Sequence, residues 1–245
     1  MRRLHIALLA LPIMALFCAA SAPAADLPNK QALDDAIRNY LLEHPEVIVQ
    51  SLQKYDDLQR ASREKATSDA LVAHKDEIFH HPMTPITGDP KGDVTMVEFF
   101  DYQCPYCKHT MQNVLEVQKD DPHLRVAWKE LPILGPTSVF AARAAMAANR
   151  QGKYLAFHTA VMGYRGKLTP NTVLTLAAKA GIDVDRLKHD MADPAIDKYL
   201  KDTLQLAQEL GINGTPGFVI GGKLVPGALD KQQMKDLIAE ARKQG

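Results

Sequence analysis

The residues of this sequence best suited to chemistry are two cysteines separated by two positions. Cys104 and Cys107 stand in a Cys-Pro-Tyr-Cys motif, and the one other cysteine is Cys18, near the N-terminus. A disulfide between Cys104 and Cys107 would close a very short loop, so it would stabilise the fold little. A thiolate at such a site, by contrast, both attacks disulfides and leaves from them. The spacing therefore predicts thiol–disulfide chemistry rather than a structural cross-link.

The first cysteine is expected where a helix begins. Pro105 fits the first turn of a helix, where its missing N–H costs nothing. The free N–H groups and the dipole at that end both favour a thiolate, so the pKa of Cys104 should lie below that of a free thiol. Cys107 is then placed to resolve the mixed disulfide that Cys104 forms with a client.

A metal site is the main alternative for this motif. Cys-x-x-Cys also forms half of many zinc sites, but a closed zinc site needs four protein ligands. The sequence has no second cysteine pair, and His109 would leave the ligand set incomplete. Copper(I) suits two thiolates better, because soft ligands select it. Copper(I) binding at Cys104 and Cys107 stays open as a secondary property, and we expect no other cofactor.

The elements that would position the cysteines follow a mixed α/β pattern. An apolar run at 94–100 is typical of a strand buried on both faces, and a helix and a second strand follow it. A long helical stretch comes next, then two strands around a Gly-Gly turn and a final capped helix. The expected segments are helix 104–119, strand 124–128, a helical insert at about 136–210, strands 217–220 and 223–225, and a last helix after 230. This order predicts a thioredoxin fold with an inserted helical subdomain, over residues 94–245.

Three further regions precede that domain. Residues 1–24 have the basic start, short apolar run and small-residue end of a secretory signal peptide, and the run is short for a membrane span. Residues 26–80 predict an N-terminal helical extension, and residues 81–93 have the Pro and Gly content of a linker.

An apolar stripe runs along the N-terminal extension. Ile48, Leu52, Tyr55 and Leu58 follow one another at spacings of four, three and three residues, as in a coiled coil. The stripe predicts either an oligomerisation region, which would make the protein a homo-oligomer, or a helix that packs on its own catalytic domain.

The charge balance argues against one class of partner. Without Arg2 and Arg3 of the signal, 27 of the 29 basic residues remain against 29 acidic ones. Nucleic-acid binding needs a strongly basic surface, which such a composition does not supply. We therefore expect no nucleic acid partner.

Several segments resemble one known family. The segments VEFFDYQCPYCKHT, ELPILGPTSVFAARAAMAA and LGINGTPGFVIGG are similar to the DsbA-like periplasmic thiol–disulfide oxidoreductases, from about residue 92 to the C-terminus. The segment AIRNYLLEHPEVIVQSLQ resembles the ScsC (suppressor of copper sensitivity) proteins within that family. The second resemblance implies an oligomerisation stalk, which is trimeric in some ScsC-like proteins.

The resemblance also implies roles for particular residues. Cys104 would be the exposed nucleophile and Cys107 its buried partner, with Pro216 in a cis peptide bond beside them. The backbone of Thr215 would then face the cysteines and pair with a bound peptide. From the residues alone, Thr215-Pro216 indicates an ordinary trans turn before a strand.

Glu98 matches the buried acid that the family carries beneath its active site. An acid in an apolar strand would have a raised pKa and could carry a proton to or from Cys107. The alternative is a structural ion pair between Glu98 and a lysine such as Lys129.

Two positions depart from the strongly oxidising members of the family, which have His in place of Tyr106 and Val in place of Thr215. Tyr brings no positive charge, so the disulfide should be less oxidising. We expect a periplasmic disulfide isomerase or oxidase that acts on unfolded or misoxidised exported proteins, with a DsbB-like or DsbD-like membrane redox partner. A redox-linked copper(I)-binding or client-holding protein is the alternative.

Overall fold

The computed structural model describes residues 29–244, so the expected signal peptide and Cys18 lie outside the described residues. The chain divides into two compact units, residues 1–56 and 57–245. The described part of the first unit holds helix α1 (Lys30–Glu43) and the beginning of helix α2 (Glu46–Ala73), which continues into the second unit.

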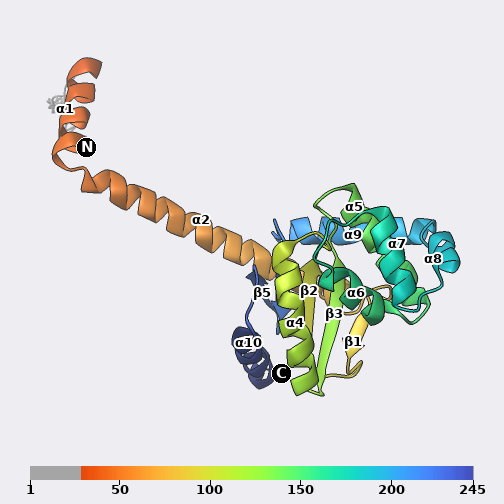
Figure 1. The fold of residues 1–245 in the computed structure, drawn as a ribbon. Helices are drawn as coiled ribbons and strands as arrows, with labels where there is room; N and C mark the ends of the chain where they lie inside the picture. The colour runs from red at the N-terminus through yellow and green to blue at the C-terminus, as the bar shows by residue number, and fades with distance from the viewer. Residues whose placement is uncertain (1–28, 245) are drawn as a thin grey trace, which may run out of the picture. The chain divides into compact units, whose positions relative to one another are not determined.

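The second unit is built on a mixed five-stranded sheet (Figure 1). The strands are β1 (Ile86–Gly88), β2 (Val94–Phe100), β3 (Leu124–Glu130), β4 (Gly217–Ile220) and β5 (Lys223–Pro226). Their order is β1-β3-β2-β4-β5, with β2 and β3 parallel and the other pairs antiparallel. Around the sheet lie α3 (Lys75–Phe79), α4 (Pro105–Asp120), α5 (Pro136–Arg150), α6 (Tyr154–Gly163), α7 (Pro170–Lys179), α8 (Val184–Asp190), α9 (Pro194–Glu209) and α10 (Lys231–Gln244). This is the predicted thioredoxin-like fold, with helices α5 to α9 inserted between β3 and β4.

The central strand β2 is covered on both faces, as its apolar run predicted. Met96 and Phe100 belong to the larger core cluster, which includes side chains of α4, α10 and the inserted helices. Val97 and Phe99 belong to a second cluster, which includes Ile78 of α3 and residues of α9. Because neighbouring side chains of a strand point to opposite faces, both layers are needed to bury this run.

Side chains cap the first turns of three helices, and the cap of the last one confirms the sequence prediction. The Thr169 side chain caps α7 in a reciprocal box with Thr172, and the Asp193 side chain caps α9; each cap is followed by a proline. Asp230 and Gln233 exchange side-chain-to-backbone hydrogen bonds of 2.8 and 2.9 Å before α10. Each cap satisfies N–H groups that the first turn of a helix leaves free.

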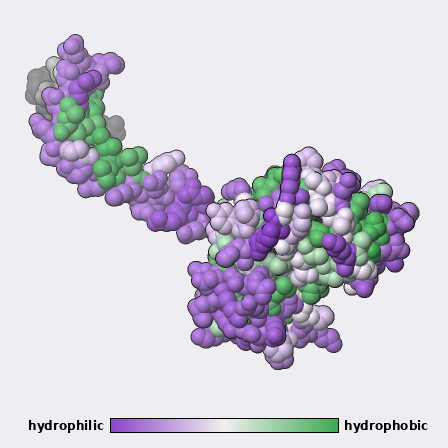
Figure 2. All heavy atoms as spheres, viewed as in Figure 1, coloured by the Kyte–Doolittle hydropathy of each residue, from purple (hydrophilic) through white to green (hydrophobic). Residues whose placement is uncertain are grey.

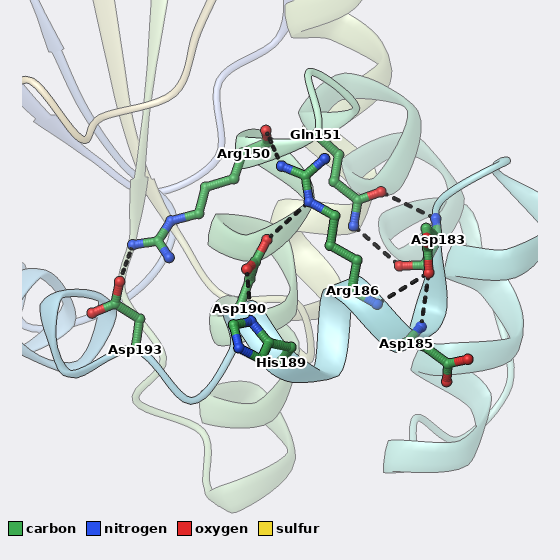
Figure 3. Close-up of polar contacts among 8 residues, drawn as sticks. All are labelled: Arg150, Gln151, Asp183, Asp185, Arg186, His189, Asp190 and Asp193. Carbon is green, nitrogen blue, oxygen red and sulfur yellow. Dashed lines mark hydrogen bonds and ion pairs between the residues drawn. The ribbon is translucent and has the colours of Figure 1, made fainter.

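Polar side chains tie α8 to the end of α5 (Figure 3). Gln151 donates to the Asp183 carbonyl and accepts its N–H, both at 3.1 Å. The Asp183 carboxylate caps α8 by accepting the N–H groups of Asp185 and Arg186 at 3.0 Å. Arg186 reaches back to the Arg150 carbonyl at 3.3 Å, which closes the connection between the two helices.

The segment 81–93 is not the free linker that its composition suggested. It contains β1, which pairs with β3 in the register Ile86 to Ala127. The Trp128 backbone N–H donates to the Pro85 carbonyl at 3.0 Å, and the Trp128 indole donates to the Thr87 hydroxyl at 2.9 Å. The prolines and glycines therefore mark the turns around an edge strand of the second unit.

The N-terminal helices carry exposed apolar side chains (Figure 2). The four stripe residues Ile48, Leu52, Tyr55 and Leu58 are 47, 60, 60 and 56 % exposed. The exposed apolar residues of α1 are Leu33, Ile37, Tyr40 and Leu42. Within residues 29–244, no helix has the length and apolar character that crossing a membrane requires.

Candidate active site

Cys104 is the N-cap residue of α4, with Pro105 in the first turn as predicted. Its sulfur accepts the backbone N–H of Cys107 at 3.4 Å. The hydrogen bond from the Cys107 thiol is the largest cause that lowers the pKa of Cys104, and contacts with Thr215 and the backbone N–H groups of Cys107 and Tyr106 add to it. The pKa falls from an ordinary 9.0 to about 6, so Cys104 is mainly a thiolate at neutral pH.

Cys107 has the opposite character. Its side chain is fully buried in the first turn of α4. Burial is the main cause that raises the pKa of the Cys107 thiol far above its ordinary range, followed by the hydrogen bond to Cys104 and the charge of Glu98. The two sulfurs are therefore divided into a thiolate and a protonated thiol that donates to it.

The Thr215–Pro216 peptide bond is cis and lies beside the first cysteine. The Cys104 sulfur lies 3.2 Å from the Thr215 carbonyl oxygen. An open groove of about 420 Å³ adjoins this contact, lined in part by Ile212, Pro216 and Leu224. The segment that the resemblance placed beside the cysteines is thus found there.

The expectation of an exposed nucleophile is wrong for this structure. Cys104 is only 3 % exposed, against 0 % for Cys107. The Thr215 carbonyl that lies against the Cys104 sulfur accounts for part of this cover. The exposed residues of the motif are instead Pro105 and Tyr106, and Tyr106 is 67 % exposed.

Glu98 is a buried acid beneath the cysteines. It is 1 % exposed, and neither carboxylate oxygen has a hydrogen-bond partner among the described residues. Burial, and to a lesser extent the charge of Cys104, raise the pKa of Glu98 from 4.5 to about 8. Such a group is protonated at pH 7 and gives up its proton just above it.

Lys129 is not the partner of Glu98. In the parallel pairing of β2 and β3, Glu98 lies opposite Trp128, whereas Lys129 lies opposite Phe99 and so faces the other side of the sheet. The Lys129 ammonium donates to the Glu77 carbonyl at 2.6 Å and to a threonine hydroxyl at 2.8 Å. The ion-pair alternative is therefore wrong.

A buried polar cluster that the sequence did not predict lies beside the motif. Tyr102 donates to Glu130 at 3.3 Å and lies at hydrogen-bond distance from His158, also 3.3 Å, while Tyr154 donates to the same Glu130 oxygen at 2.9 Å. Burial raises the pKa of Glu130 and lowers the pKa of His158 to about 3. His158 is therefore uncharged at neutral pH, and no local spacing in the sequence predicts that these side chains meet.

Asp101 was missed as well. It lies three residues before Cys104, is 1 % exposed, and accepts hydrogen bonds from Gln103, Leu134 and Ser138. Its one signal in the sequence is an acid between an apolar strand and the cysteine motif.

Within the described part of the chain, no group of three or more His, Cys, Asp or Glu side chains is arranged to hold a metal ion.

Two parts of the chain match known families. Residues 95–239 match the DSBA-like thioredoxin domain, and residues 29–62 match the N-terminal domain of the copper resistance protein ScsC. The first match covers strands β3 to β5, all of β2 except Val94, both cysteines and the inserted helices, whereas β1 lies outside it. The second match covers α1 and the first part of α2.

Solved structures agree with these matches, and curated relatives match part of the chain. A thioredoxin-like oxidoreductase from Silicibacter pomeroyi is 48 % identical, with a TM-score of 0.67, covering 69 % of this chain and 97 % of that one. A linker-deletion variant of ScsC from Proteus mirabilis is 25 % identical, with a TM-score of 0.70, covering 91 % of this chain and 100 % of that one. The Na⁺/H⁺ antiporter NhaA 1 of Salinispora arenicola is 28 % identical over 158 residues, which is 64 % of this chain. The match spans 24 % of that relative's length.

Proposed function

The chain belongs to the family of DSBA-like thioredoxin domains and is a thiol–disulfide oxidoreductase, and from that premise we propose that it rearranges disulfides in exported proteins through Cys104 and Cys107. The observation that carries the proposal is the division of the pair into an N-cap thiolate and a buried thiol. A low pKa makes Cys104 both a populated nucleophile and a good leaving group.

The first step is attack by the Cys104 thiolate on one sulfur of a client disulfide. A sulfur–sulfur bond forms between Cys104 and the client as the client disulfide breaks, and the departing client sulfur leaves as a thiolate. The groove beside Thr215 would hold the extended client segment during this step, with the Thr215 backbone as its hydrogen-bonding edge.

The second step decides between isomerisation and reduction. If the freed client thiolate attacks another client disulfide, and a client thiolate then displaces Cys104, the client is rearranged without net oxidation. If Cys107 attacks Cys104 instead, the client leaves reduced and the enzyme is oxidised. Reduction by a DsbD-like membrane partner would then have to restore the dithiol.

Two features favour isomerisation over simple oxidation. Tyr106 supplies no positive charge next to Cys104. The pKa of Cys104, about 6, lies in the upper part of the range of about 3.5–7.5 known for activated cysteines. A less stabilised thiolate makes a less oxidising disulfide, so more of the enzyme stays reduced and ready to attack.

We expect the reduced protein to restore activity to a client protein with scrambled disulfides, and the Cys104→Ser variant to have no such activity. The reduction potential of the Cys104–Cys107 pair should lie near about −180 mV, as in isomerases, rather than near about −120 mV. Equilibration with glutathione measures the potential. A value near −120 mV, together with rapid dithiol oxidation and no reactivation, would replace the isomerase proposal by an oxidase.

Glu98 is proposed as the proton acceptor for Cys107. Glu98→Gln should slow the attack of Cys107 on a preformed Cys104 mixed disulfide by on the order of 10²-fold, the usual contribution of a general base. In the unmodified protein this rate should rise with pH up to about 8, where the Glu98 carboxyl ionises. Stopped-flow release of a fluorescent thiol measures it, and an unchanged pH profile in the variant would contradict the role.

The stability of the same variant gives an independent check. In the unfolded chain Glu98 ionises above pH 4.5, but in the folded protein it stays protonated up to about pH 8. The native state therefore loses stability as the pH rises through this window, by up to roughly 4 kcal/mol. Glu98→Gln should remove this loss, whereas Glu64→Gln on the exposed side of α2 should not. Denaturant unfolding at pH 4.5 and pH 8.5 compares them.

Copper(I) binding by Cys104 and Cys107 is the second candidate function. It is favoured by the match of residues 29–62 to the N-terminal domain of a copper resistance protein. Two adjacent thiol groups also suit a soft ion. Titration of the reduced protein against a copper(I) chelator, with Cys104→Ser as control, tests it.

We also propose that residues 1–24 direct the protein to the periplasm and that residues 26–80 form an oligomerisation region.

A further inference from the structure

The carboxylate of Asp101 is the centre of the turn that leads into Cys104. Its Oδ1 atom accepts the Gln103 N–H and the Ser138 hydroxyl, both at 2.7 Å. Its Oδ2 atom accepts the Leu134 N–H at 2.9 Å. The three donors come from the cysteine turn, the loop after β3 and the first turn of α5. One side chain thus holds three segments together.

The side chain of Gln103 completes a closed set of bonds. It donates to the Ser138 hydroxyl at 2.9 Å and to the Leu134 carbonyl at 3.1 Å. Ser138 therefore donates to Asp101 and accepts from Gln103. With its donors and acceptors satisfied in this way, the cysteine turn has little freedom to move relative to the inserted helices.

The backbone of Asp101 reaches both cysteines. Its carbonyl accepts the Cys104 N–H at 3.1 Å. A backbone hydrogen bond from Asp101 also acts on the Cys107 sulfur. A shift of this residue would consequently displace the N-cap sulfur from the N–H groups at the start of α4.

We propose that Asp101 is a positioning residue for thiol–disulfide exchange, whose carboxylate fixes the 101–104 turn so that the Cys104 sulfur stays at the N-terminus of α4. The inference rests on the proposed function of Cys104 as nucleophile. The partners of the Asp101 carboxylate are donors of Gln103, Leu134 and Ser138, so it acts on Cys104 through the turn. A neutral residue with fewer acceptor sites could not accept from all three donors at once.

The direction in which the pKa of Cys104 shifts in Asp101→Asn separates this positioning role from a purely electrostatic one. A buried negative charge disfavours a second one nearby, so loss of the charge alone would lower the pKa of Cys104. Loss of the turn geometry would raise that pKa, because the sulfur would leave the N–H groups that stabilise its thiolate. Positioning and charge therefore predict opposite shifts for Asp101→Asn.

The test measures the Cys104 thiolate by ultraviolet absorbance against pH, and the rate of attack on a small disulfide over the same range. We expect Asp101→Asn to lower the acid dissociation constant of Cys104 by about tenfold, a shift of one pKa unit. The pH at which the rate falls on the acid side of the profile should rise by the same amount. The matched control is Asp183→Asn, which weakens another carboxylate cap of backbone N–H groups far along the chain and should leave both profiles unchanged.

The variants Ser138→Ala and Gln103→Ala keep the charge of Asp101. If Asp101→Asn does not fold, the pKa of Cys104 in these two variants tests the inference instead. Each removes side-chain bonds of the closed set and should shift the Cys104 profile in the same upward direction by a smaller factor. A fall in the pKa of Cys104 in Asp101→Asn, or unchanged profiles in Ser138→Ala and Gln103→Ala, would overturn the inference. If Cys104→Ser itself retained full exchange activity, the proposed function would fail instead.

Discussion

A protein with Cys107 replaced by Ala is expected to accumulate covalent complexes with its clients through Cys104. The Cys104 thiolate is still formed and still attacks, but the thiol that would displace the client is gone. Well-placed intramolecular groups act at effective concentrations of about 10⁵ M or more. Release by an external thiol should therefore be slower by on the order of a hundredfold or more, and overall reductase turnover should fall accordingly.

The matched control is Cys104→Ala, which keeps Cys107. Burial holds the pKa of Cys107 far above its ordinary range, and the side chain is fully buried, so this variant should trap no client. Non-reducing electrophoresis and peptide mass analysis of complexes formed with a denatured exported protein that carries scrambled disulfides identify the cysteine involved. Equal trapping by both variants would show that the roles of Cys104 and Cys107 are wrongly assigned.

Most helices and strands could be predicted from local sequence patterns, because the interactions that begin and end them join residues close together in the chain. The caps at Thr169 and Asp193 are formed by a side chain and the N–H groups that follow it. The turn between β4 and β5 needs two residues with positive φ, and Gly221 and Gly222 supply them at 57° and 76°. In each case the residues that decide the structure are neighbours in the chain.

The sequence predictions were wrong where the structure depends on contacts between residues far apart in the chain. The second strand was predicted over 124–128, yet the charged residues Lys129 and Glu130 continue β3 and are 1 % exposed. Lys129 is satisfied by the Glu77 carbonyl and Glu130 by tyrosines of other elements. These partners lie at least 24 residues away and cannot be read from local periodicity.

The active site divides in the same way. The motif and the helix start at Pro105 identified both cysteines and the thiolate at Cys104 from physical reasons alone. The placement of Thr215 and Glu98 came from a family resemblance, because their residue types allow other interpretations. Asp101 was not identified at all, since its importance rests on three donors that only the folded chain brings together.

The folded position of α3 changes how the N-terminal region should be tested. Ile78 is fully buried against the sheet, and the Phe79 carbonyl accepts a hydrogen bond from Arg125 at 2.8 Å. A protein shortened to begin near residue 82 would lose these contacts together with the apolar stripe. Substitution of the stripe in the mature chain, rather than truncation, can separate assembly from stability.

We expect the combined variant Ile48→Gln, Leu52→Gln and Tyr55→Gln to be monomeric and to lose isomerase activity. These side chains are 47–60 % exposed in the single chain, and an apolar face of this kind is stabilised when copies of the helix bury it against one another. An isomerase must hold one client and attack it repeatedly. Tethered active sites raise the local concentration of cysteines at a bound client, so reactivation of a scrambled substrate should fall by on the order of tenfold or more in the monomer.

The control variant is Gln50→Ala with Gln53→Ala, which changes the opposite side of α2 and should remain assembled and active. Light scattering gives the mass of each protein, and unfolding curves show whether the catalytic unit keeps its stability. Dithiol oxidation by the stripe variant should be unchanged or faster, because each Cys104–Cys107 pair is intact and is no longer shared around one client. A monomeric mass for the unmodified mature protein would contradict the assembly itself. An assembled protein whose stripe variant is monomeric yet isomerises at the full rate would show that isomerisation needs only one active site.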